Sequence, residues 1–198
     1  LSLNNALSTS CMSTLSGHSS PARCVAVLDG GARLVSGGGD NTLKIWDVAT
    51  QQCTATLSGH SNVVWCVAVL DGGARLVSGG GDNTLKIWDV ATQQCTATLS
   101  GHSSPARCVA VLDGGARLVS GGGDNTLKIW DVATQQCTAT LSGHSNVVWC
   151  VAVLDGGARL VSGGGDNTLK IWDVATQQCT ATLSGHSSPA RCVAVLDG

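Results

Sequence analysis

The chain is dominated by a repeat of 42 residues. The repeat begins at Gly17 and recurs at Gly59, Gly101 and Gly143 with changes only just after its histidine, and a further copy begins at Gly185. A period of this length is typical of stacked or radial architectures, in which each unit buries its apolar surface against its neighbours. We therefore expect one array rather than separate domains, and we expect equivalent residues to act alike in every unit.

Each unit has the pattern of four short strands. In the unit that begins at Gly59, continuous β-rich runs alternate with turn signals, which include Asp-Gly-Gly and the segment Gly79–Asn83. Glycine recurs too often for helices, and no segment has a period of 3.6 residues. The predicted strands are Val64–Leu70, Arg75–Ser78, Thr84–Trp88 and Gln94–Leu99. The unit is therefore predicted to be an antiparallel meander that is apolar on both faces and needs a neighbour on each side.

Three sequence elements recur together in every full unit. In the second unit they are Gly59-His60, then Ser78 and Asp82, and finally Trp88-Asp89. Their combination, at constant spacing over nearly the whole chain, resembles the WD40 repeat. The resemblance implies an all-β fold, a β-propeller of four-stranded antiparallel blades, with four complete blades plus terminal single strands. It also implies that the residues before each Gly-His form the outermost strand of the preceding blade.

The expected organisation is a single array over residues 1–198. Ser8–Ser16 aligns with Thr50–Ser58 and is predicted to be a lone outer strand, and Arg191–Leu196 is predicted to be the innermost strand of an unfinished blade. The absence of an initiator methionine and the stop inside a repeat suggest a fragment. The predicted segments are a lone outer strand at 9–16, full repeats at 17–58, 59–100, 101–142 and 143–184, and a partial repeat at 185–198.

The resemblance assigns a buried chain of four polar side chains to each blade. An indole N–H, a hydroxyl, an imidazole and a carboxylate can satisfy one another in series, and each group left unpaired would cost about 1–3 kcal/mol. Their expected role is structural. The four sets are Trp46, Ser36, His18 and Asp40; Trp88, Ser78, His60 and Asp82; Trp130, Ser120, His102 and Asp124; and Trp172, Ser162, His144 and Asp166.

Serine, histidine and aspartate are also the residue types of a hydrolytic triad. Catalysis is not predicted, because the set recurs in every unit beside a tryptophan and no Gly-x-Ser-x-Gly turn is present. The glycine run has no following Gly-Lys-Ser/Thr and is interpreted as a turn rather than a phosphate-binding loop. No metal site is expected, because histidines 42 residues apart would lie on separate blades. No cofactor is predicted.

Alternate units differ only just after Gly-His, where they read Ser-Ser-Pro-Ala-Arg or Ser-Asn-Val-Val-Trp. The resemblance places this segment on the narrower top face around the central channel, where WD40 partners commonly dock. Tryptophan and arginine are enriched at binding hot spots. Two interpretations stay open: a partner-binding rim, or tryptophans packed on neighbouring blades with solvated arginines. The rim residues are Arg23, Trp65, Arg107, Trp149 and Arg191.

The charge and cysteine patterns exclude several classes of protein. The net charge is −2 and basic residues are spaced singly, so neither nucleic-acid nor membrane binding is predicted, and no signal peptide or membrane span is visible.

Each unit carries one cysteine in its first strand and one in its fourth, too far apart for a disulfide. We expect reduced, buried thiols in a cytoplasmic protein. They are Cys24, Cys66, Cys108, Cys150 and Cys192, and Cys11, Cys53, Cys95, Cys137 and Cys179.

Three functions are compatible with these features. The first is a non-catalytic platform for protein or peptide partners, which the resemblance implies and the rim favours. The others are a multivalent lectin-like or small-ligand binder, and an engineered or fragment propeller with no assigned activity. Because four blades would leave apolar faces bare at both ends, we expect a head-to-tail homodimer that closes an eight-bladed ring. The alternative is a longer array that closes on itself.

Overall fold

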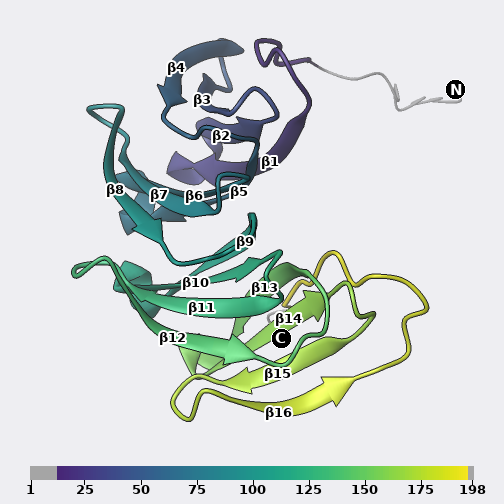
Figure 1. Ribbon diagram of the computed structural model, residues 1–198. Coiled ribbons are helices and arrows are strands. Elements are labelled where there is room, and N and C mark those ends of the chain that lie inside the picture. The colour runs from purple at the N-terminus through teal and green to yellow at the C-terminus, as the bar shows by residue number, and fades with distance from the viewer. Residues whose placement is uncertain (1–12, 196–198) are drawn as a thin grey trace, which may run out of the picture.

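The computed structural model describes residues 13–195 of the 198-residue chain, and strands make up most of that part (Figure 1). Sixteen strands form four antiparallel sheets of four strands each, and in every sheet the strands follow chain order. The fold is therefore all-β and each sheet is a meander, as predicted. We call the sheets blades 1 to 4.

Each blade runs from its first strand on the inside to its fourth strand on the outside. Blade 1 contains β1 (Ala22–Leu28), β2 (Arg33–Gly38), β3 (Thr42–Asp47) and β4 (Gln52–Ser58). Blade 2 contains β5 (Val64–Leu70), β6 (Arg75–Gly80), β7 (Thr84–Asp89) and β8 (Gln94–Ser100). Blade 3 contains β9 (Ala106–Leu112), β10 (Arg117–Gly122), β11 (Thr126–Asp131) and β12 (Gln136–Ser142). Blade 4 contains β13 (Val148–Leu154), β14 (Arg159–Gly164), β15 (Leu169–Asp173) and β16 (Gln178–Leu183).

The Asp-Gly-Gly turn after each first strand is a short 3-10 helix: η1 (Asp29–Gly31), η2 (Asp71–Gly73), η3 (Asp113–Gly115) and η4 (Asp155–Gly157). In η2 all three residues have positive φ angles, of 50° at Asp71, 63° at Gly72 and 111° at Gly73. Backbone of this kind is left-handed and favours glycine, which explains the composition of the turn. The turn between the second and third strands likewise holds Asn83 at a φ of 68°.

The glycine run is only partly a turn, because Gly79 and Gly80 belong to β6. A Cβ on Gly79 would lie 2.5 Å from Cys66 Sγ and 3.1 Å from the Cβ of Ala106 in the next blade. A Cβ on Gly80 would lie 2.4 Å from Nδ1 of His60. These two glycines are therefore required by close packing of the next blade and of the histidine ring, rather than by the turn.

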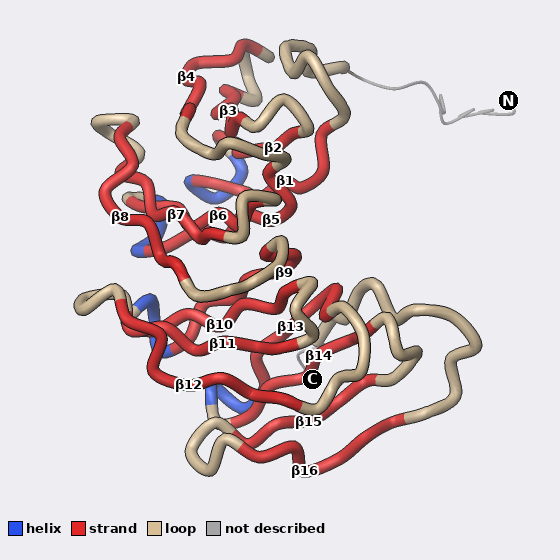
Figure 2. Tube along the Cα trace, in the orientation of Figure 1, coloured by secondary structure: helices blue, strands red, loops and turns tan. Residues whose placement is uncertain are grey.

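The four blades follow one another along an arc that is open on one side (Figures 1 and 2). Contacts between β1 and β5, between β5 and β9, and between β9 and β13 place the first strands side by side on the inner edge of the arc. The fourth strands lie on the outer edge and are the most exposed. This arrangement is that of consecutive blades in a β-propeller.

The hydrophobic core lies between blades. We call the two sides of a blade its tryptophan face, which contacts the preceding blade, and its aliphatic face, which contacts the following one. Between blades 2 and 3, Leu85, Ile87 and Leu99 on the aliphatic face pack against Leu118 and Trp130 on the tryptophan face. The equivalent residues meet between blades 1 and 2 and between blades 3 and 4. One interface is thus used three times.

The terminal segments differ from the prediction. Of the expected outer strand at 9–16, residues 9–12 lie outside the described part, and residues 13–16 form no strand. The expected strand Arg191–Leu196 is also wrong over its described residues, which have no regular secondary structure up to Val195. A strand needs a partner for its backbone hydrogen bonds, and within residues 13–195 neither segment pairs with a strand of any sheet.

The cysteine prediction holds only for the inner strands. Cys66, Cys108 and Cys150 are buried and Cys24 is half-buried, whereas the thiols of the fourth strands and Cys192 are exposed. The fourth strand is the outer edge of its blade, and successive side chains of a strand point to opposite faces. The cysteine of this strand lies on the side that faces solvent. The exposed fourth-strand thiols are Cys53, Cys95, Cys137 and Cys179; Cys11 lies outside the described residues.

Candidate functional site

Each blade contains a chain of three side-chain hydrogen bonds. In blade 2 the indole Nε1 of Trp88 donates to Ser78 Oγ over 2.8 Å, Ser78 Oγ lies 2.7 Å from Nε2 of His60, and Nδ1 of His60 lies 2.8 Å from Asp82 Oδ2. Because a carboxylate only accepts, Nδ1 carries the imidazole proton and Nε2 accepts from the serine hydroxyl. Every polar atom of the chain therefore has a partner.

The same hydrogen bonds occur in the other three blades. The indole-to-hydroxyl distance is 2.8 Å in each, and the histidine Nε2 lies 2.7–2.8 Å from the serine oxygen. In blade 1, His18 Nδ1 contacts both oxygens of Asp40, at 3.0 and 2.9 Å. The structure thus brings together all sixteen residues of the four predicted sets, one set in each blade.

The aspartate ties this chain to the backbone at the top of the blade. Asp82 accepts from the backbone N–H of Ser61 through Oδ2 and from the N–H and hydroxyl of Thr84 through Oδ1. Sequence reasoning missed the threonine, although a Thr two residues after the Asp recurs in every unit. The carboxylate therefore fastens the Gly-His segment, the turn between the second and third strands, and the start of the third strand to one another.

Burial and these hydrogen bonds set the charge states. Burial lowers the pKa of His60, His102 and His144, and it outweighs the neighbouring aspartates, which would raise it. For Asp166, burial alone would raise the pKa, but the hydrogen bonds from His144, Thr168 and Ser145 together lower it to about 2. A neutral imidazole beside an ionised carboxylate is therefore the state of these pairs at neutral pH.

The Asp–His–Ser geometry is that of a triad, but the serine is not available as a nucleophile. Ser78 is 0% exposed, and its oxygen already accepts the Trp88 indole N–H while contacting His60. Nucleophilic catalysis requires a hydroxyl that can reach a substrate. In blades 2 to 4 this arrangement can order the blade, and it offers no surface on which a substrate could bind.

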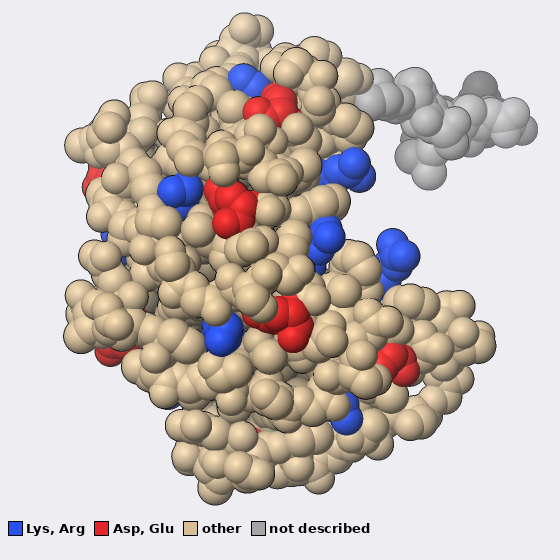
Figure 3. Space-filling view, viewed as in Figure 1, with Lys and Arg blue, Asp and Glu red and all other residues tan. Residues whose placement is uncertain are grey.

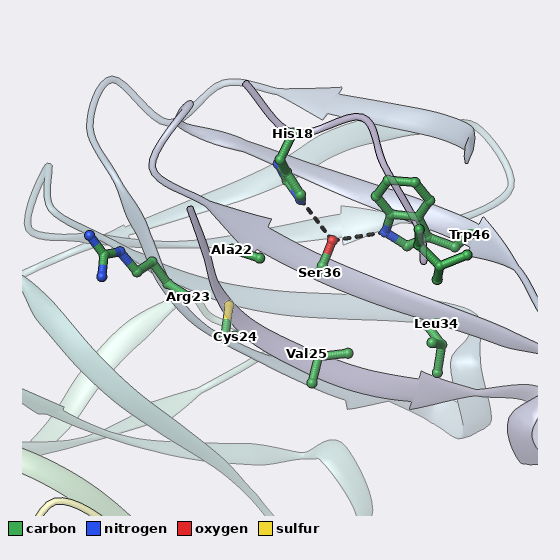
Figure 4. A pocket seen from close by; sticks show the side chains of 9 residues that line it. His18, Ala22, Arg23, Cys24, Val25, Leu34, Ser36 and Trp46 are labelled. Atoms are coloured by element: carbon green, nitrogen blue, oxygen red, sulfur yellow. Dashed lines mark hydrogen bonds between the residues drawn. The ribbon is translucent and has the colours of Figure 1, made fainter. Parts of the chain in front are cut away.

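Blade 1 differs because no other blade within residues 13–195 covers its tryptophan face. A cavity of about 350 Å³ opens there, lined by His18, Ser36, Trp46, Leu34 and Val25 among others (Figure 4). Val25 is 65% exposed, whereas Val67, its equivalent in blade 2, is half-buried and packs against the core between blades 1 and 2. The cavity is therefore one half of the interface that the interior blades bury, rather than a pocket formed by special residues.

The five predicted rim residues contact one another in a continuous stack. The guanidinium carbon of Arg23 lies 5.3 Å from the ring centroid of Trp65, and that of Arg107 lies 4.1 Å from the same centroid. Arg107 and Arg191 each lie 5.1 Å from the centroid of Trp149. All of these distances are within the range of cation–π attraction. We call this alternating series the Arg/Trp stack.

A backbone irregularity in the first strand explains where these side chains point. In β1 the pairing passes from Ala22 opposite Gly38 to Cys24 opposite Gly37, so Arg23 is the extra residue of a β-bulge. The bulge recurs at Trp65, Arg107 and Trp149. An extra residue in a bulge is re-aimed relative to the strand pleat. Figure 4 shows Arg23 directed away from the Trp46–Ser36–His18 chain.

The arginines at the opposite end of the strands have a different environment. Arg33, Arg75, Arg117 and Arg159 each pair with the aspartate of the preceding 3-10 helix, four residues earlier. Near this end, a cleft of about 450 Å³ between blades 2 and 3 is lined by Asp71, Arg75, Asp113 and Asp131 among others. The charged groups of this cleft are already engaged, because Asp71 pairs with Arg75 and Asp131 accepts from Thr134.

Other sites are not apparent over residues 13–195. This part of the chain contains no group of three or more His, Cys, Asp or Glu residues placed to hold a metal ion. It also contains no helix of the length and apolarity needed to cross a bilayer. Burial raises the pKa of the Cys24 and Cys150 thiols to about 11, so these inner-strand thiols are not activated nucleophiles.

The comparisons with known proteins agree with this architecture. A family described as WD40, "WD domain, G-beta repeat", matches four segments: residues 9–47, 51–89, 93–131 and 135–173. The match at 51–89 spans β4 of blade 1 and the three inner strands of blade 2, so the repeat is offset from the blade by one strand. The comparison with curated proteins finds no match. Because the four matches cover most of the chain, this protein belongs to the WD40-repeat family.

Proposed function

We propose that this chain is a non-catalytic platform that binds protein or peptide partners through the Arg/Trp stack. WD40 repeats typically build propellers that serve as scaffolds for protein interaction, and the family therefore supports the general role. The observation that supports this particular surface is the stack itself: the last of the four positions that vary between units carries arginine or tryptophan, and these side chains form one continuous row.

Rigid support favours the same role. The four stack residues that belong to blades 1 to 4 project from the bulges of innermost strands, and the hydrogen-bond chain of each blade anchors the neighbouring loop, as in blade 2. Preformed side chains lose little conformational freedom when a partner binds, which favours affinity. In blades 2 to 4 the buried serines support a non-catalytic assignment.

A peptide library displayed on phage tests the platform even though its partner is unidentified. We expect the immobilised chain to enrich peptides that no longer bind after the double substitution Trp65→Ala and Trp149→Ala. The matched control is Lys86→Ala, which changes an exposed contact with Thr98 between the two outer strands of blade 2. Peptides that bind the tryptophan variant as well as the unmodified chain would contradict the assignment.

We further propose that two copies of this chain associate head to tail and close a ring of eight blades. The tryptophan face of blade 1 and the aliphatic face of blade 4 are less covered than their interior equivalents, as the exposed Val25 and Leu183 show, and they are the two halves of the interior interface. Blades 2 and 4 carry tryptophan in the stack, and blades 1 and 3 carry arginine. The junction of blade 4 with blade 1 of a second copy would therefore pair the same two kinds of blade as the junction of blade 2 with blade 3. With blade 1 of a second copy in place, Leu183 of blade 4 would make the contacts that its equivalent Leu99 makes with blade 3.

The partial repeat must move for this dimer to form. Ala190 is seated against Gly163 as Ala106 is seated against Gly79, and Arg191 stacks on Trp149. A second copy would place its own Ala22 and Arg23 there, because residues 184–198 repeat the sequence of residues 16–30. If the chain is part of a longer array, further blades would occupy the same position.

A further inference from the structure

The arginines of the Arg/Trp stack have no carboxylate partner within residues 13–195. Every other arginine of that part of the chain pairs with an aspartate, so the molecule contains two classes of guanidinium. Arg107 is the extreme case, because its Nε is buried and has no hydrogen-bond partner among the described residues. A guanidinium has five N–H donors, and stacking on an indole uses none of them. The stack therefore holds unused donors.

The stack also concentrates like charge. Arg107 and Arg191 each lie 5.1 Å from the centroid of Trp149, so their guanidinium carbons are at most twice that distance apart. Arg23 and Arg107 are similarly close across Trp65. Positive charges at this separation repel one another, and the indole faces offset only part of that repulsion. Figure 3 shows Lys and Arg side chains along the concave edge of the molecule, where a ligand could reach them.

The indole faces of the stack are not free. Trp65 receives Arg23 from blade 1 and Arg107 from blade 3, and Trp149 receives Arg107 and Arg191 in the same way. A single-stranded nucleic acid would need open aromatic faces on which its bases could stack. Arg23 and Arg191 are exposed and Arg107 is half-buried, so the guanidinium N–H groups other than the buried Nε of Arg107 remain for a ligand. Carboxylates are the protein groups that match these N–H groups in charge and in geometry.

We propose that the Arg/Trp stack recognises an acidic segment of a partner protein, whose carboxylates accept hydrogen bonds from Arg107 and from the arginine on either side. The inference rests on the proposed function, and it specifies the chemistry of the partner. In a peptide with polyproline II conformation, residues three positions apart lie on the same face and roughly 9 Å apart, which suits carboxylates that bind successive arginines of the stack. The tryptophans hold the guanidiniums in place and reduce the freedom they lose on binding.

Fluorescence anisotropy with labelled 12-residue peptides tests the inference on the full 198-residue chain. The probe has four Glu-Ser-Ser repeats, and its matched control has four Gln-Ser-Ser repeats. We expect saturable binding of the Glu peptide at low salt, at least about tenfold weaker binding in Arg107→Gln, and a similar loss in high salt. Arg117→Gln is the control variant, because Arg117 lies in the same blade at the opposite end and pairs with Asp113. It should change binding less than about twofold.

Each other outcome overturns the inference in a distinguishable way. If both peptides bind equally and Trp65→Ala removes both, the rim docks peptides without recognising charge, and the proposed function stands while the acidic partner does not. If the Glu peptide does not bind, or if Arg117→Gln weakens it as much as Arg107→Gln, the site is wrong. A thymidine oligonucleotide that binds more tightly and loses binding in Arg107→Gln would assign the stack to nucleic acid. Thermal unfolding of each variant checks that the fold is kept.

Discussion

Blades 2 and 4 carry the same aliphatic face, but within this chain only blade 2 has a full blade to cover it. Leu99 is 1% exposed where it packs against blade 3, whereas Leu183 is 49% exposed at the equivalent place on blade 4. The tryptophan faces differ in the same way, since Val25 in blade 1 is exposed and Val67 in blade 2 is half-buried against the core. Identical sequences therefore differ in burial because of their neighbours alone, and the energetic unit of the array is the interface between blades.

A pair of matched substitutions tests whether the interface between blades, rather than the blade itself, supplies the stability. Leu99→Ala removes a fully buried side chain and should cost about 2–5 kcal/mol of unfolding free energy. Leu183→Ala makes the same change in the same local sequence, and should cost less than about 1 kcal/mol at concentrations low enough to keep the chain monomeric. Urea unfolding followed by circular dichroism measures both. Equal costs would show that the outer strands are stabilised within each blade and not by the neighbour.

The hydrogen-bond chains allow a second, smaller test of the same contrast. His60→Ala removes one hydrogen-bond partner from each of Ser78 and Asp82 and should lower the unfolding free energy by about 1–3 kcal/mol. His186 begins the partial repeat and is exposed, so His186→Ala should change stability by less than about 0.5 kcal/mol. The comparison needs only equilibrium unfolding. A negligible effect of His60→Ala would mean that the chain of hydrogen bonds orders the blade without stabilising it.

Much of the fold could be predicted because every unit repeats the same local signals. The strand Val64–Leu70 has its predicted bounds, and the residues of the hydrogen-bond chains follow from the Gly-His, Ser, Asp and Trp pattern. The close packing of Gly79 against Ala106 could not be predicted, because it depends on the approach of the next blade, whereas periodicity describes one unit. The bulge at Trp65 could not be predicted either, because it lies in the pairing of β5 with β6 and leaves no signal in the run of apolar residues.

The rim shows the same limit. Sequence alone leaves open whether Trp65 packs on a neighbour or forms part of a binding surface. In the structure Trp65 packs between the two arginines beside it, and neither arginine has a carboxylate partner among the described residues. The prediction of the terminal strands is wrong for a related reason: an alignment to interior units assumes a neighbouring strand, and within the described chain the segment that ends at Val195 has none. The prediction that the outer cysteines are buried is wrong for another reason, because the outer edge of every blade faces solvent, in interior blades as well.

The mass of the protein in solution tests most directly whether the interface between interior blades also joins blade 4 of one copy to blade 1 of another. Sedimentation equilibrium should give a folded species of twice the chain mass of 19.9 kDa at high micromolar concentrations. Ala22→Arg should keep the fold but lose the dimer, because Ala22 is exposed in one chain and would be buried at the junction as Ala106 is between blades 2 and 3. A folded chain that stays at 19.9 kDa at every concentration would contradict the account.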